Sequence, residues 1–295
     1  MPELATPQPQ AALRAGFDAA AGLVHLLGRR RYLISDSVAN AAFALQPRRR
    51  EVTAANFQAV FPQLGRRQAR RLAARSYREY ARTSLDFLYV HHLSRARLLA
   101  GFRAHGVEIL HQLQAERRGA ILLLFHHGAW DAGGAYASAV GLPLTSVMAD
   151  EGAPALRDLV IWARAEIGMR VVPASQSARV VLETLRGGGL VALLADIPGD
   201  TPAVEVDFLG RRTKFSALPS RLAEHTGCPL IPVVSVRSPA GGYFIEVHPP
   251  HHLIPGDDPE AGLRPVLEVF ERTVRRWPEQ WYPFGEDRLR GPAHD

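Results

Sequence analysis

Residues 120–131 read AILLLFHHGAWD, and this stretch indicates the fold class. It begins with a short apolar run, the pattern of a β-strand that is buried on both faces of a sheet. Gly128 follows two histidines, so a turn is expected where the strand ends. Doubly buried strands belong to parallel sheets, whose connections are usually helices. The stretch therefore predicts an α/β protein.

Similar apolar runs recur along the chain, with helical periodicity between several of them. The runs fall at residues 144–148, 171–172, 190–195, 204–208, 230–236 and 243–247. Helices are expected over residues 132–140, 153–167, 177–185, 217–225 and 262–277. This alternation predicts a mixed, mostly parallel sheet with helices on both faces.

The chain before this sheet is expected to form a helical N-terminal region. Two helices are predicted within residues 48–90, and the second begins with a very basic segment. No linker rich in proline, glycine or serine divides the later chain. We expect residues 1–45 to form an amphipathic helical region with possible membrane contact, and residues 46–295 to form a single α/β domain.

Residues 11–28 carry an apolar stripe at helical spacing, followed by Arg29, Arg30 and Arg31. The stripe consists of Leu13, Phe17, Ala20, Val24 and Leu27. An apolar face beside a basic cluster is typical of a helix that lies in a membrane interface, although a helix packed on its own protein shows the same pattern. No segment offers the ~20 uninterrupted apolar residues that span a bilayer. A peripheral membrane protein is therefore expected.

Composition and charge narrow the function classes. The chain has 295 residues, of which 47% are hydrophobic and 22% charged, as in globular and not disordered proteins. Its 35 Lys and Arg against 29 Asp and Glu give a net charge of +6, which suits an anionic partner, although codon bias gives the same arginine excess. No stacking or groove-reading motif accompanies this charge, so no nucleic-acid partner is expected.

Cysteine and histidine spacing argue against disulfide and metal sites. Cys228 is the single cysteine, so it can form neither an internal disulfide nor a zinc–thiolate cluster, and a reducing compartment is expected. The histidines lack the H-E-x-x-H or H-x-x-E-H spacing of zinc hydrolases, so no metal is predicted. The N-terminus lacks the pattern of a cleaved secretory signal.

His126 is the candidate catalytic residue, because it lies where the first strand stops. Ligands bind beyond the carboxyl ends of strands in open α/β sheets. A tight turn can fold the carboxylate of Asp131 onto the imidazole, whose other nitrogen can then take a proton from a hydroxyl. No serine or cysteine in the motif can be the nucleophile, so the acceptor hydroxyl would attack directly. The alternative is a capped core histidine, with Asp131 as a helix N-cap.

His126, Gly128, Trp130 and Asp131 together resemble the HxGxW[DE] motif of the lysophospholipid acyltransferase superfamily. The likeness is to its branch of bacterial lipid A lauroyl/myristoyl acyltransferases and phosphatidylinositol mannoside acyltransferases. Further similar stretches follow in the family's order between about residue 50 and residue 282. Among them are Arg164…Gly168, Asp207-Phe208-Leu209-Gly210-Arg211 and Pro278-Glu279-Gln280-Trp281.

The resemblance implies an O-acyltransferase that moves a fatty acyl chain from acyl-CoA or acyl carrier protein to a hydroxyl of a membrane lipid or glycolipid. It implies that His126 is the general base, that Asp131 orients it, and that no metal or cofactor is needed. Trp130 and Gly128 are expected to bind substrate. A peripheral location on the cytoplasmic face of the membrane is implied as well.

Other polar residues complete the candidate site. Asp196 is a further candidate catalytic residue, because it stands where the family has an acid after a strand. Ile197 replaces the usual Gln or Arg that follows this acid, and a plain turn residue is the alternative for Asp196. Arg164 and Arg211 suit a phosphate, with an intramolecular ion pair or a solvated loop arginine as the alternatives. His127 is expected to shape the pocket.

Two other functions stay open on the sequence. An acyl-ester or thioester hydrolase would use water in place of the acceptor hydroxyl and release a free fatty acid. A noncatalytic lipid-binding protein on the same fold would not need His126 and Asp131, and both are present.

Overall fold

In the part of the chain that the structure describes, seven strands form the central sheet, in the order β1-β9-β8-β2-β5-β3-β4. The computed structural model describes residues 6–150, 152–199, 202–254, 256 and 259–285. The strands are β1 (Phe102–His105), β2 (Ala120–Leu124), β3 (Leu144–Met148), β4 (Arg170–Pro173), β5 (Leu190–Leu194), β8 (Leu230–Arg237) and β9 (Tyr243–Val247). Only the pair β8–β9 is antiparallel among these neighbours. The predicted mixed, mostly parallel sheet is confirmed.

Helices cover both faces of the sheet because successive side chains of its central strands point to opposite sides. Ile121 and Leu123 of β2 join a cluster with α9 (Ser177–Arg186), α10 (Leu218–Thr226) and α11 (Pro259–Arg276). Leu122 joins a second cluster with α6 (Val107–Ala115) and α7 (Trp130–Ala139). The run AILLLF is therefore buried on both faces, as its composition predicts.

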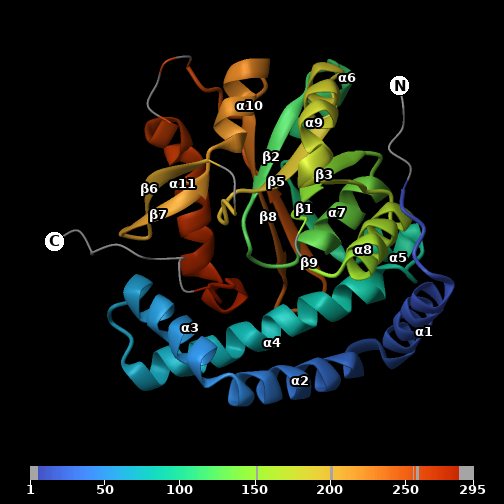
Figure 1. Cartoon of the computed structure of the whole chain (residues 1–295), viewed down its shortest axis with the longest axis vertical. Helices are drawn as coiled ribbons and strands as arrows, with labels where there is room; N and C mark the ends of the chain where they lie inside the picture. The colour runs from blue at the N-terminus through green and yellow to red at the C-terminus, as the bar shows by residue number, and fades with distance from the viewer. Residues whose placement is uncertain (1–5, 151, 200–201, 255, 257–258, 286–295) are drawn as a thin grey trace.

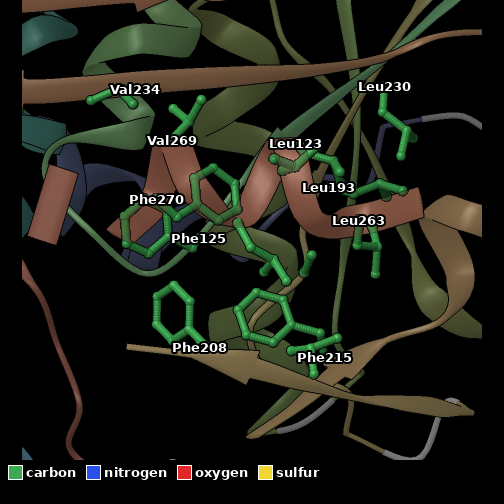
Figure 2. Close-up of a cluster of buried hydrophobic side chains, with 14 of the residues drawn as sticks. Leu123, Phe125, Leu193, Phe208, Phe215, Leu230, Val234, Leu263, Val269 and Phe270 are labelled. Carbon is green, nitrogen blue, oxygen red and sulfur yellow. The ribbon is translucent and has the colours of Figure 1, made fainter. Parts of the chain in front are cut away.

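Aromatic rings fill the larger core cluster, which Figure 2 shows. Phe125, directly after β2, stacks on Phe270 of α11 with ring centroids 4.2 Å apart. A separate antiparallel hairpin of β6 (Ala203–Phe208) and β7 (Arg211–Ser216) adds Phe208 and Phe215, which meet edge to face. This packing fixes the strand end that carries His126.

The first four helices form a layer across the carboxyl ends of β2 and β8 (Figure 1). They are α1 (Ala11–Leu27), α2 (Arg31–Leu45), α3 (Pro47–Val60) and α4 (Arg66–Val90). α4 crosses the carboxyl end of β2, where the Thr83 hydroxyl donates to the Gly128 carbonyl at 3.2 Å. α2 packs on α4 and lies outside it. α5 (Arg95–Ala100) then leads into β1.

The apolar stripe of α1 faces the protein, which is the second of the two alternatives that the sequence left open for it. Val24 is buried, and the Phe17 ring meets Phe87 of α4 and Trp162 of α8 (Pro154–Glu166) edge to face. The stripe turns inward because α4 and α8 offer aromatic side chains there. None of the helices in the described ranges is both long enough and apolar enough to cross a bilayer.

Buried charges tie α2, α4 and β8 together. Asp86 of α4 is 1% exposed and accepts from Arg31 of α2 at 2.9 Å. Arg237, the last residue of β8, lies 2.8 Å from the other carboxylate oxygen of Asp86 and donates to Thr83 at 3.1 Å. The Tyr32 hydroxyl donates to Asp86 at 2.9 Å, and burial together with this carboxylate raises the pKa of Tyr32 to about 12. This network joins the helical layer to the carboxyl ends of the strands, where His126 lies.

Candidate active site

The register of the sheet brings His126 and Asp196 together. β2 and β5 are parallel neighbours, with Leu124 opposite Leu194, so the residues two places beyond each strand also face one another. The His126 Nδ1 lies 2.8 Å from Asp196 Oδ1, and the His126 backbone N–H donates to the same oxygen at 3.0 Å. Asp196 is buried, whereas the His126 side chain is 30% exposed.

This pairing sets up an imidazole that can accept a proton. A carboxylate at Nδ1 favours the tautomer that carries its hydrogen there, so the lone pair lies on Nε2. The same carboxylate stabilises the imidazolium that forms when Nε2 takes a proton. Because Asp196 also accepts from the His126 backbone, the ring and its main chain are held by one anchor. The arrangement can serve as a general base.

Asp131 is held by Arg164 and not by the imidazole, which differs from the expected fold-back onto His126. Arg164 of α8 donates to the two carboxylate oxygens through Nε at 2.8 Å and Nη2 at 3.3 Å. Asp131 is the second residue of α7, and the start of this helix turns its side chain towards α8. Of the alternatives for Arg164, the structure shows the intramolecular ion pair.

A cavity of about 80 Å³ is lined by this ion pair and by apolar residues of α7 and the sheet. Trp130, Asp131 and Arg164 contribute to its lining, and aliphatic residues such as Leu122 and Leu144 form other parts of the wall. The Trp130 ring meets the His126 ring edge to face, with centroids 5.6 Å apart. Trp130 therefore lies between the imidazole and the cavity.

Gly128 shapes the loop that carries the imidazole. Its φ is +68°, and a Cβ there would lie 2.0 Å from the Ser235 carbonyl oxygen of β8, so no other residue fits without a shift of the backbone. Its own carbonyl accepts from Thr83 and from the Tyr282 hydroxyl at 3.0 Å. The structure thus shows a conformational requirement at Gly128.

Residues 278–282 hold the same loop from the other side. Gln280 accepts from the Gly128 backbone N–H at 2.8 Å, and its side chain makes two hydrogen bonds with the Arg237 backbone. The Tyr282 N–H donates to the His126 carbonyl at 3.1 Å. Buried Trp281 pairs with His127 in a short antiparallel bridge. The PEQW segment, residues 278–281, and Tyr282 therefore support the loop that carries the histidine motif.

His127 points into the core, away from the solvent that reaches His126. It is 4% exposed, stacks on Phe125 and has its Nε2 at 3.0 Å from the Trp277 carbonyl. Because this carbonyl can only accept, Nε2 carries the hydrogen. Burial lowers the pKa of His127 from 6.5 to about 3. A neutral imidazole that packs behind the site fits this environment.

Neutral His127 should make the fold less stable in acid. The unfolded chain takes up a proton at this residue below its ordinary pKa of 6.5, whereas the folded chain does so only near 3. The contribution of neutral His127 to the free energy of unfolding is therefore fully present above about pH 6.5. It falls by up to ~1.4 kcal/mol per pH unit below that pH. His127→Gln should remove this part of the pH dependence, whereas His111→Gln on the exposed side of α6 should not. Urea unfolding between pH 7 and pH 5 gives the free energy of unfolding at each pH. Equal slopes of this free energy against pH for the two variants would contradict the prediction.

Arg211 lies at the start of β7, opposite Phe208 in the hairpin and on a different element from the His126 loop. It is half-buried. Its neighbour Arg212 pairs with Glu260 of α11 at 2.8 Å. This places Arg211 in the structure without assigning it a ligand.

Comparison with known proteins supports the relationship that the motifs indicate. A phosphatidylinositol mannoside acyltransferase of Mycobacterium tuberculosis is 28% identical over 211 residues, which cover 70% of this chain and 66% of the relative. A lipid A biosynthesis acyltransferase of Haemophilus influenzae is 27% identical over 232 residues, or 77% of this chain and 71% of the relative. The match thus spans just under two thirds of the mycobacterial protein. The family model for bacterial lipid A biosynthesis acyltransferases matches residues 16–286, and the chain belongs to that family.

Proposed function

We propose that this protein transfers a fatty acyl group from an acyl thioester to a hydroxyl of a membrane glycolipid, with His126 as the general base. The observation that carries the proposal is the 2.8 Å contact between His126 Nδ1 and buried Asp196, which leaves Nε2 to accept a proton. The donor is acyl-CoA or acyl carrier protein, and no metal takes part. The relatives named above are acyltransferases of phosphatidylinositol mannoside and of lipid A biosynthesis, which supports a glycolipid acceptor.

The reaction follows from the geometry of the pair. His126 Nε2 takes the proton of the acceptor hydroxyl while the oxygen attacks the thioester carbonyl. The new C–O bond forms, the C–S bond breaks, and the imidazolium returns its proton to the leaving thiolate. Asp196 stabilises the imidazolium throughout, as a buried carboxylate does in the hydrolase triads.

Asp131 and Arg164 take a positioning role in this proposal. Their ion pair forms part of the cavity wall near Trp130, so it fixes the start of α7 against α8. The charge of Arg164 is compensated there, so Arg164 is not proposed as the main site for a phosphate. Arg211 stays a candidate for a phosphate of the donor or acceptor.

The apolar cavity beside Trp130 is proposed to take the acyl chain. Ala137 lines it two turns of α7 beyond Trp130, which is about 10 Å along the helix. Ala137→Leu should shift the preference to shorter chains, and Ala137→Val should shift it less. Competition between acyl donors of different length, read by mass spectrometry of the product, measures the shift. Unchanged preference in a folded Ala137→Leu protein would contradict this placement.

The protein is proposed to work peripherally at the cytoplasmic face of the membrane, with residues 46–295 as the acyltransferase domain.

Lipid mass spectrometry of cells with and without the gene tests the proposed acyl transfer directly. We expect one glycolipid class to lose an acyl chain in the deleted strain and to regain it with the wild-type gene but not with His126→Ala. Release of free fatty acid with no acylated lipid would identify a hydrolase instead.

A further inference from the structure

The exposed side of α1 and α2 carries a second set of aliphatic residues, separate from the inward stripe. Within the described residues, six of the ten exposed large hydrophobic side chains fall on these two helices. They are Leu23, Leu26, Leu33, Ile34, Val38 and Leu45, and we call this surface the outer α1–α2 face. Leu26 is 83% exposed and Leu45 is 80% exposed. Such a concentration marks a surface that meets an apolar partner.

The face is a consequence of the helical period of α2. Arg31, Ser35 and Ala39 lie four residues apart and are buried on the α4 side. Leu33 therefore lies on the opposite side of the helix, whereas Ile34, Val38 and Leu45 share one flank of it, at which they are 48%, 61% and 80% exposed. Figure 1 shows α2 as the outermost helix below α4, and the exposure of Leu33, Val38 and Leu45 shows that the described residues leave their side chains uncovered.

Arginines surround the outer α1–α2 face. Residues 1–90 hold fourteen arginines and six acidic residues, a formal charge of +8 against +6 for the whole chain. Arg29 and Arg30 are exposed at one end of α2, and Arg48 and Arg49 are exposed just beyond its other end. A hollow beside Phe43 at that second end is lined by four arginines of α4. The cationic charge thus lies at both ends of the α2 part of the outer α1–α2 face.

Few acidic side chains oppose this charge. Asp36 of α2 is taken up by Arg82, with N···O at 2.6 Å, and Glu51 of α3 lies within 3.5 Å of Arg66 and 3.3 Å of Arg70. Apolar side chains flanked by a formal excess of arginines match the chemistry of an anionic bilayer, in which acyl chains lie beneath negative headgroups.

A second copy of the chain fits the face less well. A twofold axis that pairs two antiparallel α2 helices would place Arg29 and Arg30 of one copy opposite Arg48 and Arg49 of the other. Cations would then meet cations at both ends, which disfavours the pairing.

We propose that the outer α1–α2 face docks on an anionic lipid bilayer, with its aliphatic side chains inserted and its arginines on the headgroups. This deepens the proposed function, since a lipid acceptor stays in the bilayer. α4 lies between α2 and the carboxyl ends of the strands. Docking would therefore turn these strand ends, and His126 with them, towards the membrane.

Sedimentation of the full-length protein with vesicles tests the proposal. The vesicles contain phosphatidylcholine alone or mixed with phosphatidylglycerol. Leu33→Gln with Val38→Gln should weaken binding about tenfold or more, because both side chains are 61% or more exposed and would lose their apolar insertion. The matched control is Leu156→Gln with Ile254→Gln, two residues that are 56% and 66% exposed elsewhere, and it should bind as the wild type does. Arg29→Gln with Arg30→Gln should weaken binding only to the anionic vesicles, and added salt should act likewise.

Three readouts decide the result. Equal vesicle binding by wild type and the Leu33/Val38 variant in folded form overturns the proposal. A dimer in light scattering that this variant converts to monomers, with vesicle binding unchanged, assigns the face to a second copy and overturns it too. Retained acylation of a detergent-dispersed acceptor by the variant shows that docking, and not chemistry, was removed. Vesicle binding through the face without any acyl transfer by wild type would leave the docking intact and reject the proposed function.

Discussion

His126→Ala should lower the rate of acyl transfer by about 10²–10⁴-fold while the protein stays folded. The imidazole is 30% exposed and makes its side-chain hydrogen bond to Asp196, so its loss removes proton transfer with little loss of packing. The measurement is initial rates of product formation at saturating donor, with circular dichroism as the check on folding. Wild-type rates in a folded His126→Ala protein would reject the mechanism.

The two aspartates provide the internal control for this result. Asp196→Asn puts an amide against His126 Nδ1 and favours the tautomer with its hydrogen on Nε2, so we expect a loss of the same order as His126→Ala. Asp131→Asn weakens the ion pair with Arg164 and should cost less, mainly in KM. If Asp131→Asn lost as much kcat as Asp196→Asn, the motif acid would share in the proton transfer.

Asp86→Ala should cost about 3–5 kcal/mol of folding free energy, because it leaves Arg31 and Arg237 as buried charges without their carboxylate. The matched control is Asp36→Ala, whose salt bridge to Arg82 joins side chains that are 26% and 29% exposed and should cost about 1 kcal/mol or less. Urea or thermal unfolding of both variants measures the difference. Similar losses for the two variants would show that the Asp86 network does not act as a buried ion pair. If Asp86→Ala does not accumulate, Asp86→Asn should give a smaller loss of the same sign.

The sequence predicted the central sheet well because buried parallel strands leave a continuous apolar run. It missed β1 and β7, whose residues FRAH and RRTKFS are largely polar. These strands lie at a sheet edge and in a separate hairpin, where polar side chains can face solvent. Short polar strands carry no periodic signal that distinguishes them from loops.

The candidate site shows the same limit more sharply. His126 and Asp196 each lie two residues after a five-residue strand, so equal offsets were visible in the sequence. Their meeting depends on β2 and β5 being neighbours although β3 and β4 come between them along the chain. Local spacing pointed to Asp131, but strand order placed Asp196 on the imidazole. Helical periodicity likewise predicted the stripe of α1 but not which partner it would cover.

The hydrogen bonds between residues 278–282 and the loop of residues 126–128 have a consequence for how the chain folds during synthesis. Gly128, His126 and Arg237 all bond to this segment, which leaves the ribosome after every strand of the sheet. A chain still in synthesis can therefore pack β2 against β5, yet its loop lacks these hydrogen bonds until residue 282 has emerged. The loop that carries the imidazole therefore gains its final hydrogen bonds last.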